Sequence, residues 1–188
     1  MSSKFRALAL VIVLLLAFSL LGAESFGERT AASLKARGVS PWLIVLLISM
    51  LPIVELRGAI PVAIAVLGMP WTEAVPLAIL GNMLPIPFLL LFLELFLKFI
   101  SRWGWGRRFT DWLYARARSR GKVVERYEEL GLIVFVGIPL PGTGGWTGAL
   151  VAKIFGLNFW KSLLCVFLGV LLAALAVTLI TLLGASLF

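Results

Sequence analysis

Apolar residues gather into long runs along this chain, and polar or basic stretches separate the runs. The runs cover approximately residues 7–21, 42–69, 74–97, 130–155 and 162–187. An apolar run of about 20 residues is long enough for a helix to cross a bilayer. The runs 42–69 and 130–155 differ from the others because proline, glycine or charged residues interrupt them. The pattern predicts an all-α polytopic membrane protein with two broken membrane segments.

The first 40 residues are organised differently from the rest. Lys4 and Arg6 precede the apolar run 7–21, and the polar stretch 24–40 follows it. This order is typical of a signal anchor or a signal peptide, with its basic end inside and residues 24–40 outside. Cleavage or retention of residues 1–23 is left open. We expect a leader region over 1–40 with an extra hydrophobic helix, and one transmembrane domain over 41–188.

An internal repeat relates two parts of the transmembrane domain at an offset of 88 residues. Residues 66–74 align with 154–162, and Leu80-Gly81 aligns with Leu168-Gly169. A broken, proline-rich segment lies just before each copy. Interrupted apolar segments at matching places in two halves indicate the binding region of a transporter built from inverted repeats. We therefore expect repeat one over 41–97 and repeat two over 130–188.

The basic residues predict how these repeats are oriented. Residues 98–129 carry nine Lys and Arg against four acids, which predicts a cytoplasmic, amphipathic linker. If each broken segment crossed the membrane fully, this linker would lie outside. If 41–67 and 130–155 are instead re-entrant hairpins, the linker, Lys153 and Lys161 all lie inside. The charge pattern favours hairpins, each followed by one spanning helix, with the two halves inverted.

The first broken segment contains the first candidate site, the pair Glu55 and Arg57. A charge near the bilayer centre costs roughly 2.5–3.5 kcal/mol on insertion scales, so such groups usually line an ion or substrate path. Pro52, Gly58 and Pro61 are expected to break the helix around the pair and to open a cavity there. We hypothesise that Glu55 binds a coupling proton and that Arg57 binds an anionic group. The alternative is a neutralised pair that only holds helices together.

The second broken segment contains the second candidate site. Glycine N–H groups there are able to converge on a phosphate or carboxylate, with threonine hydroxyls as further donors. The expected site residues are Pro139, Pro141, Gly142, Thr143, Gly144, Gly145 and Thr147. The alternative is close helix packing on these small residues. Asn82 is expected to support the site by a hydrogen bond to a neighbouring helix or to a freed carbonyl.

Composition restricts the classes of partner, cofactor and activity that the chain is expected to have. Hydrophobic residues make up 61% of the chain, and the mean hydropathy is +1.07. The net charge of +8 is therefore attributed to contact with membrane lipids rather than nucleic acid. Without histidine and with one cysteine, neither a metal site nor a cofactor is expected. No catalytic triad or Walker A motif is present, so an enzyme is not expected. The small size favours a homodimer, with Ala173, Ala174 and Ala176 as a contact.

Three blocks of the sequence resemble the family of small multidrug export proteins. They are LPIVELRGAIP at 51–61, GNMLPIP at 81–87 and IPLPGTGGWTGA at 138–149, and the likeness extends from about Pro41 to the C-terminus. The resemblance implies a prokaryotic protein of the inner or plasma membrane that exports small molecules. The paired hairpins also resemble, more distantly, the DedA and VTT-domain proteins, a group linked to lipid translocation.

Three functions are compatible with these observations. The first is a small membrane exporter with an unassigned substrate, driven by protons. The second is a translocase for an anionic lipid head group such as polyprenyl phosphate. The third is a membrane scaffold that transports nothing. Glu55 favours the first function and Arg57 favours the second, whereas the third requires neither residue.

Overall fold

The computed structural model describes residues 26–120, 122–140 and 142–187; the expected N-terminal helix and Pro141 lie outside them. These residues form helices and connecting turns and no strand, which confirms the all-α class. A helical segment over 26–36 comes first. It is followed by α2 (Pro41–Met50), α3 (Glu55–Pro61), the π-helical turn η1 (Val62–Val66), α4 (Trp71–Met83), α5 (Pro85–Ile100), α6 (Gly104–Arg120), α7 (Lys122–Gly137), α8 (Gly145–Ile154) and α9 (Phe159–Leu187).

Two stretches of helix within the described ranges are long and apolar enough to cross a membrane, Trp71–Ile100 and Phe159–Gly184. The first contains α4 and α5, and only Leu84 separates them. Leu84 has helical dihedral angles, φ −53° and ψ −47°. Pro85 follows as the first residue of α5, where its missing N–H would have no partner inside the helix. Within residues 81–87, only Leu84 is not assigned to a helix.

The first broken segment folds as two helices that pack against each other, α2 and α3. The break follows from Pro52, because proline disfavours helical angles in the residue before it. Accordingly, α2 ends at Met50, and Leu51 is extended with φ −73° and ψ 131°. The helices meet through a buried apolar core that includes Ile44, Ile48, Leu56 and Ile60.

The second broken segment also folds as two helices in contact, α7 and α8. Helix α7 ends just before Ile138-Pro139, and α8 begins at Gly145. Helix α8 also contacts α5 and α6. Both expected hairpins thus have the form of helix, break and helix, while their re-entrance into the membrane stays a prediction.

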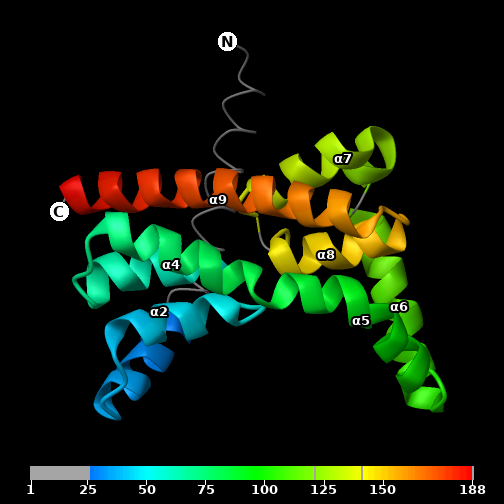
Figure 1. Cartoon of the computed structure of the whole chain (residues 1–188), viewed down its shortest axis with the longest axis horizontal. Helices are drawn as coiled ribbons and strands as arrows, with labels where there is room; N and C mark the ends of the chain where they lie inside the picture. Colours follow the sequence, from blue (N-terminus) through cyan, green and yellow to red (C-terminus); the bar gives the residue numbers. More distant parts are fainter. Residues whose placement is uncertain (1–25, 121, 141, 188) are drawn as a thin grey trace, which may run out of the picture. The chain divides into compact units, whose positions relative to one another are not determined.

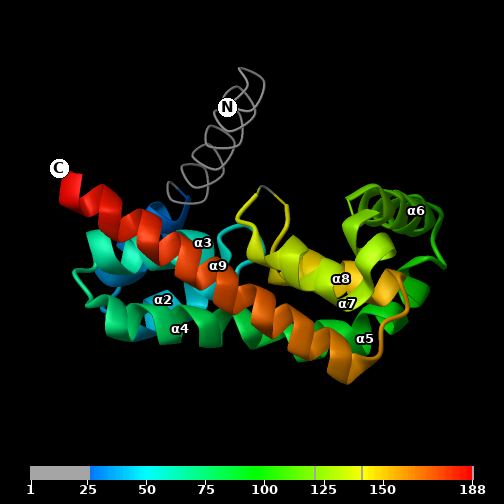
Figure 2. The same ribbon diagram turned by 90° about the horizontal axis from the view of Figure 1, so that it is seen from above.

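The described chain divides into two compact units. The first contains residues 26–81, Pro139–Gly142 and the end of α9 from Ala174; α2 lies beside α4 in this unit (Figure 1). The second contains Asn82–Ile138 and Thr143–Ala173, and its helices α7 and α8 run side by side (Figure 2). The loop between α7 and α8 consequently contributes Pro139–Gly142 to the unit that contains α3.

Residues that the 88-residue offset aligns have similar local structures. Gly68 and Gly156 both end a short helix with positive φ angles, 69° and 74°. In the first unit, a Cβ atom at Gly81 would lie 2.5 Å from the carbonyl oxygen of Leu46 in α2. In the second unit, a Cβ atom at Gly169 would lie 2.6 Å from the Cβ of Val136 in α7. A long helix therefore approaches the first helix of a hairpin at an aligned glycine in each unit. Inversion of the two halves stays a prediction.

The basic linker and the alanines of the expected dimer contact lie as follows. Residues 98–129 contain the end of α5, the helix α6 and the start of α7, and their amphipathic, cytoplasmic character stays a prediction. Trp103, Trp105 and Trp112 are exposed, as expected of side chains at a membrane surface. Ala173 and Ala174 are each only 2% exposed, whereas Ala176 is half-buried, and the homodimer stays a prediction.

Candidate functional site

Glu55 and Arg57 are the two charged side chains of α3, and both are buried. Glu55 is 6% exposed and Arg57 is 8% exposed. Every residue of α3 is buried, including Gly58 and Pro61, whereas Pro52 in the preceding turn is exposed. Buried charges are rarely tolerated without partners, because removing them from water costs several kcal/mol per ion. The surroundings of the pair must therefore stabilise both charges.

One partner of Arg57 is the loop of the second broken segment. Its Nη1 donates a hydrogen bond of 2.6 Å to the carbonyl oxygen of Leu140, 83 residues along the chain. Pro139–Gly142 belongs to the same compact unit as α3. The charge of Glu55 also attracts that of Arg57. The structure thus brings Arg57 together with Glu55 and with the loop after Pro139, while a ligand-binding role for these residues stays a prediction.

The backbone of Glu55 adopts an unusual conformation. Its φ is +51°, the one positive φ at a non-glycine position in the described chain. A residue with a Cβ atom pays roughly 1–2 kcal/mol in this left-handed region. Such strain is found most often at functional sites, where the surrounding structure holds it in place. On a regular helix, two side chains that are two residues apart point away from each other. The irregular backbone at Glu55 therefore affects how the side chains of Glu55 and Arg57 are oriented.

This strain leads to a prediction about stability. Glu55→Gly should be more stable than Glu55→Ala by about 1–2 kcal/mol, because both lack the carboxylate and only glycine accepts the positive φ without cost. The free energy of unfolding of each variant is measured in mixed detergent micelles. The matched controls are Glu73→Gly and Glu73→Ala, in the regular first turn of α4. There the alanine variant should be more stable than the glycine variant. Equal stability of the two Glu55 variants would contradict the strain.

The residues of the predicted anion site lie in the loop before α8 and in its first turn, and their binding of an anion stays a prediction. The Thr143 hydroxyl donates a hydrogen bond of 2.7 Å to the carbonyl oxygen of Ile138. Gly142 is exposed and has a φ of 75°. Gly144 and Gly145 are buried at the start of α8, and Thr147 is half-buried in its first turn. Pro139 is buried at the end of the preceding helix.

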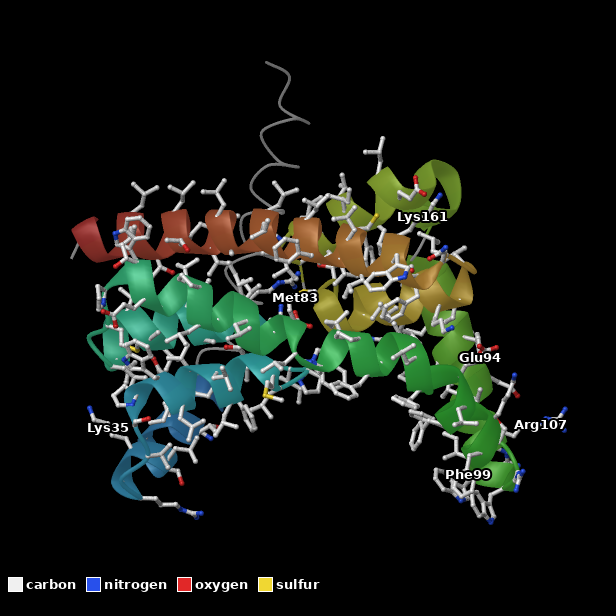
Figure 3. All side chains as sticks on the ribbon, viewed as in Figure 1. Lys35, Met83, Glu94, Phe99, Arg107 and Lys161 are labelled. Carbon is white, nitrogen blue, oxygen red and sulfur yellow. The ribbon has the colours of Figure 1, made fainter. Side chains whose placement is uncertain are left out.

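Asn82 is the last residue but one of α4, which ends at Met83, a residue labelled in Figure 3. Its side chain is 1% exposed, and neither Oδ1 nor Nδ2 has a hydrogen-bond partner among the described residues. The hydrogen bond predicted for this amide is therefore not confirmed. Leaving a buried polar group unsatisfied costs roughly 1–3 kcal/mol. Both amide atoms would lie 3.5 Å from a Cβ atom at Gly145, so the amide faces the first residue of α8.

Two ion pairs join helices in the second unit and were not predicted. Glu94 in α5 lies 3.6 Å from Lys153 in α8, as well as 3.6 Å from its helix neighbour Lys98. Lys161 in α9 lies 2.6 Å from Glu129 in α7. Of these contacts, only the one between Glu94 and Lys98 joins residues whose spacing of four along a helix is recognisable in a sequence. The acids are about half exposed, so each pair contributes at most a small stabilisation.

These features define a helical membrane protein with two buried charges at a helix break. The family model described as "Putative small multi-drug export protein" matches residues 55–176, more than half of the chain. The chain belongs to this family, which confirms the resemblance of its three sequence blocks. The match contains Glu55, Arg57, Asn82 and the whole loop before α8, and it starts later than the expected Pro41. No curated protein and no solved structure matches the chain.

Proposed function

We propose that this protein is a multi-pass exporter of the prokaryotic cell membrane that moves small organic molecules against a flow of protons. The buried Glu55 beside the buried Arg57 is the observation that carries the proposal. The family description supports export and names no particular substrate. A carboxylate in a low-dielectric site has its protonated form favoured, which suits a group that binds and releases a coupling proton.

The hydrogen bond from Arg57 to Leu140 suggests how protonation would change the site. With Glu55 charged, Arg57 is attracted by Glu55 and bonded to the loop after Pro139. Protonation of Glu55 removes that attraction. It therefore changes the relative strength of the two interactions that position Arg57, one with Glu55 and one with the loop. Proton binding would thereby bias the contact between α3 and the second broken segment. A substrate that contacts either group is then coupled to the proton.

The proposal includes the topology expected from the charge pattern. The two helix-break-helix segments enter the membrane as re-entrant hairpins from opposite sides, and the stretches Trp71–Ile100 and Phe159–Gly184 span it. The similar local structures at Gly68 and Gly156, and at Gly81 and Gly169, support a duplicated origin. A homodimer would provide a longer transport path than one chain of 188 residues. Membrane lipids are the expected surroundings of the exposed apolar side chains.

The test is transport of a lipophilic cation by the purified protein in liposomes with an imposed pH gradient. Wild type is expected to accumulate the cation, and Glu55→Gln is expected to lose at least about 90% of the gradient-driven rate, the usual scale of removing a proton-transfer group. Glu73→Gln removes an exposed acid from α4 and is the matched control. Unchanged coupling in Glu55→Gln would reject the role of Glu55. Absence of transport by folded wild type would favour the scaffold function.

A second function, translocation of an anionic lipid head group, is favoured by the buried guanidinium of Arg57. A planar guanidinium matches phosphate oxygens in a bidentate geometry that lysine cannot reproduce. The same liposomes therefore receive a short-chain polyprenyl phosphate in a parallel measurement. Translocation that is lost in Arg57→Lys and retained in Arg29→Lys, an exposed position, would favour this function over proton-coupled export.

A further inference from the structure

We propose that the Asn82 side chain and the first turn of α8 form a binding site for an oxyanion, such as a phosphate group. Both elements belong to the second compact unit, so the site is complete within it. This proposal does not depend on the role of Glu55, because it rests on residues of the other unit. It makes Asn82 a ligand-binding residue instead of the supporting residue that the sequence suggested.

The first argument is the state of the Asn82 amide. It is buried to 99% of its surface, and its Nδ2 donor has no acceptor among the described residues. Buried polar groups in proteins are nearly always hydrogen-bonded, so an exception calls for a functional explanation. The amide faces Gly145, where α8 begins. A buried donor that points at a helix N-terminus is well placed to share a ligand with that terminus.

The second argument is the chemistry of the start of α8. The first N–H groups of a helix have no acceptor inside the helix, and the aligned peptide dipoles make this end positive. Helix α8 has ten residues, and its N-cap residue is Gly144, which has no side chain to accept a hydrogen bond from the first N–H groups. The hydroxyl of Thr143, the residue before this N-cap, donates a hydrogen bond to the carbonyl oxygen of Ile138. Backbone N–H groups at such a terminus suit an anion.

The third argument is the presence of glycine at position 145. A Cβ atom there would lie 3.5 Å from the Asn82 amide, an ordinary contact, and 3.3 Å from the Ile86 Cδ1, a tight contact with the flexible end of a side chain. Packing would therefore accept alanine at this position after a small shift of the Ile86 side chain. Gly148 differs, because a Cβ atom there would collide with the Cγ2 of Val136. Close packing requires glycine at 148 more strictly than at 145, where the absence of a side chain leaves the Asn82 amide uncovered on the side of α8.

The ligand chemistry is an oxyanion, which has two sources in a membrane. The first is a soluble anion such as inorganic phosphate, and the second is the head group of an anionic phospholipid. Both present oxygen acceptors to Nδ2 and to the N–H groups of the first turn. The position of Asn82 inside the apolar stretch Trp71–Ile100 is compatible with either source.

The experiment measures thermal unfolding of the full chain through tryptophan fluorescence. One arm adds inorganic phosphate to the protein in an uncharged detergent, and the other compares phosphatidylcholine nanodiscs with and without phosphatidic acid. A ligand that binds only the folded state raises the unfolding temperature. We expect this shift for wild type in at least one arm. A shift in the first arm identifies a soluble anion, and a shift in the second arm alone identifies a lipid head group.

The variants separate binding from packing. Asn82→Leu conserves the approximate size and should bind the oxyanion roughly ten- to hundredfold more weakly, the scale of one hydrogen bond to a charged group. Without ligand it should unfold at a higher temperature than wild type, because it removes two unsatisfied polar atoms. Gly145→Ala should also weaken binding, since its methyl group would cover the amide. Gly104→Ala, at the open first residue of α6, is the matched control and should bind normally.

Three results would overturn the proposal. The first is a wild-type unfolding temperature that neither phosphate nor phosphatidic acid changes. The second is an equal shift in wild type and Asn82→Leu. The third is a loss of stability in ligand-free Asn82→Leu, which would show that the chain itself satisfies the amide. If Asn82→Leu does not fold, the shifts of unfolding temperature in Gly145→Ala and Gly104→Ala are compared instead. An equal shift in these two variants would then overturn the proposal. Glu55→Gln should retain the phosphate shift, so failure of the export function and failure of this site are distinguishable.

Discussion

Arg57→Leu is expected to lower the free energy of unfolding by about 3–5 kcal/mol, the range measured when one partner of a buried ion pair is removed. The substitution leaves the Glu55 carboxylate, only 6% exposed, without the positive charge that attracts it. It also removes the donor to the carbonyl oxygen of Leu140. The loss is measured by unfolding in mixed detergent micelles.

The double variant Glu55→Gln with Arg57→Leu distinguishes this explanation from a simple loss of packing. Because no uncompensated charge is left, it should recover most of the stability that Arg57→Leu loses. Arg29→Leu, at an exposed position, is the control and should change the free energy of unfolding by less than about 0.5 kcal/mol. A double variant as unstable as Arg57→Leu would show that the two charges do not depend on each other.

Gly169→Ala is expected to destabilise the protein by about 1–3 kcal/mol, the usual cost of overpacking. The added methyl group would lie 2.6 Å from the Cβ of Val136 and 2.9 Å from the carbonyl oxygen of Ile133. Neither atom belongs to the flexible end of a side chain, so α7 and α9 would have to move apart. The thermal unfolding temperature of the purified protein provides the measurement.

Gly184→Ala is the matched control within the same helix. A Cβ atom at Gly184 would have no neighbour within 4 Å among the described residues. Alanine should therefore stabilise α9 there by about 0.5–1 kcal/mol, because it restricts the unfolded chain more than glycine does. If both substitutions in α9 stabilise the protein, the close approach of α7 at Gly169 is wrong.

The helices and their breaks follow from local sequence in most places. The expected span 74–97 lies within the helical stretch Trp71–Ile100, and the expected span 162–187 lies within α9. The end of α2 at Met50 follows from Pro52, since proline acts on the residue next to it. The linker was less predictable. Its basic and aromatic pattern runs from α6 into α7 and does not by itself divide the segment into helices.

The candidate site required information that the sequence does not contain. Glu55 and Arg57 were recognisable because two charges in an apolar run are costly wherever they fall. The acceptor of Arg57 was not, because a carbonyl oxygen 83 residues away carries no side-chain signature. The positive φ of Glu55 was also hidden, since glutamate has no preference for that conformation.

Sequence alone determined that this is a helical membrane protein, where its broken segments lie and which two charges they contain, because hydropathy, proline and charge act locally. Only the tertiary structure decided that packing requires glycine at 148 more strictly than at 145, and that the Asn82 amide has no hydrogen-bond partner among the described residues. Those properties depend on which atoms of distant segments approach within a few ångströms. Such distances are set by how the helices pack and not by the residue types at each position.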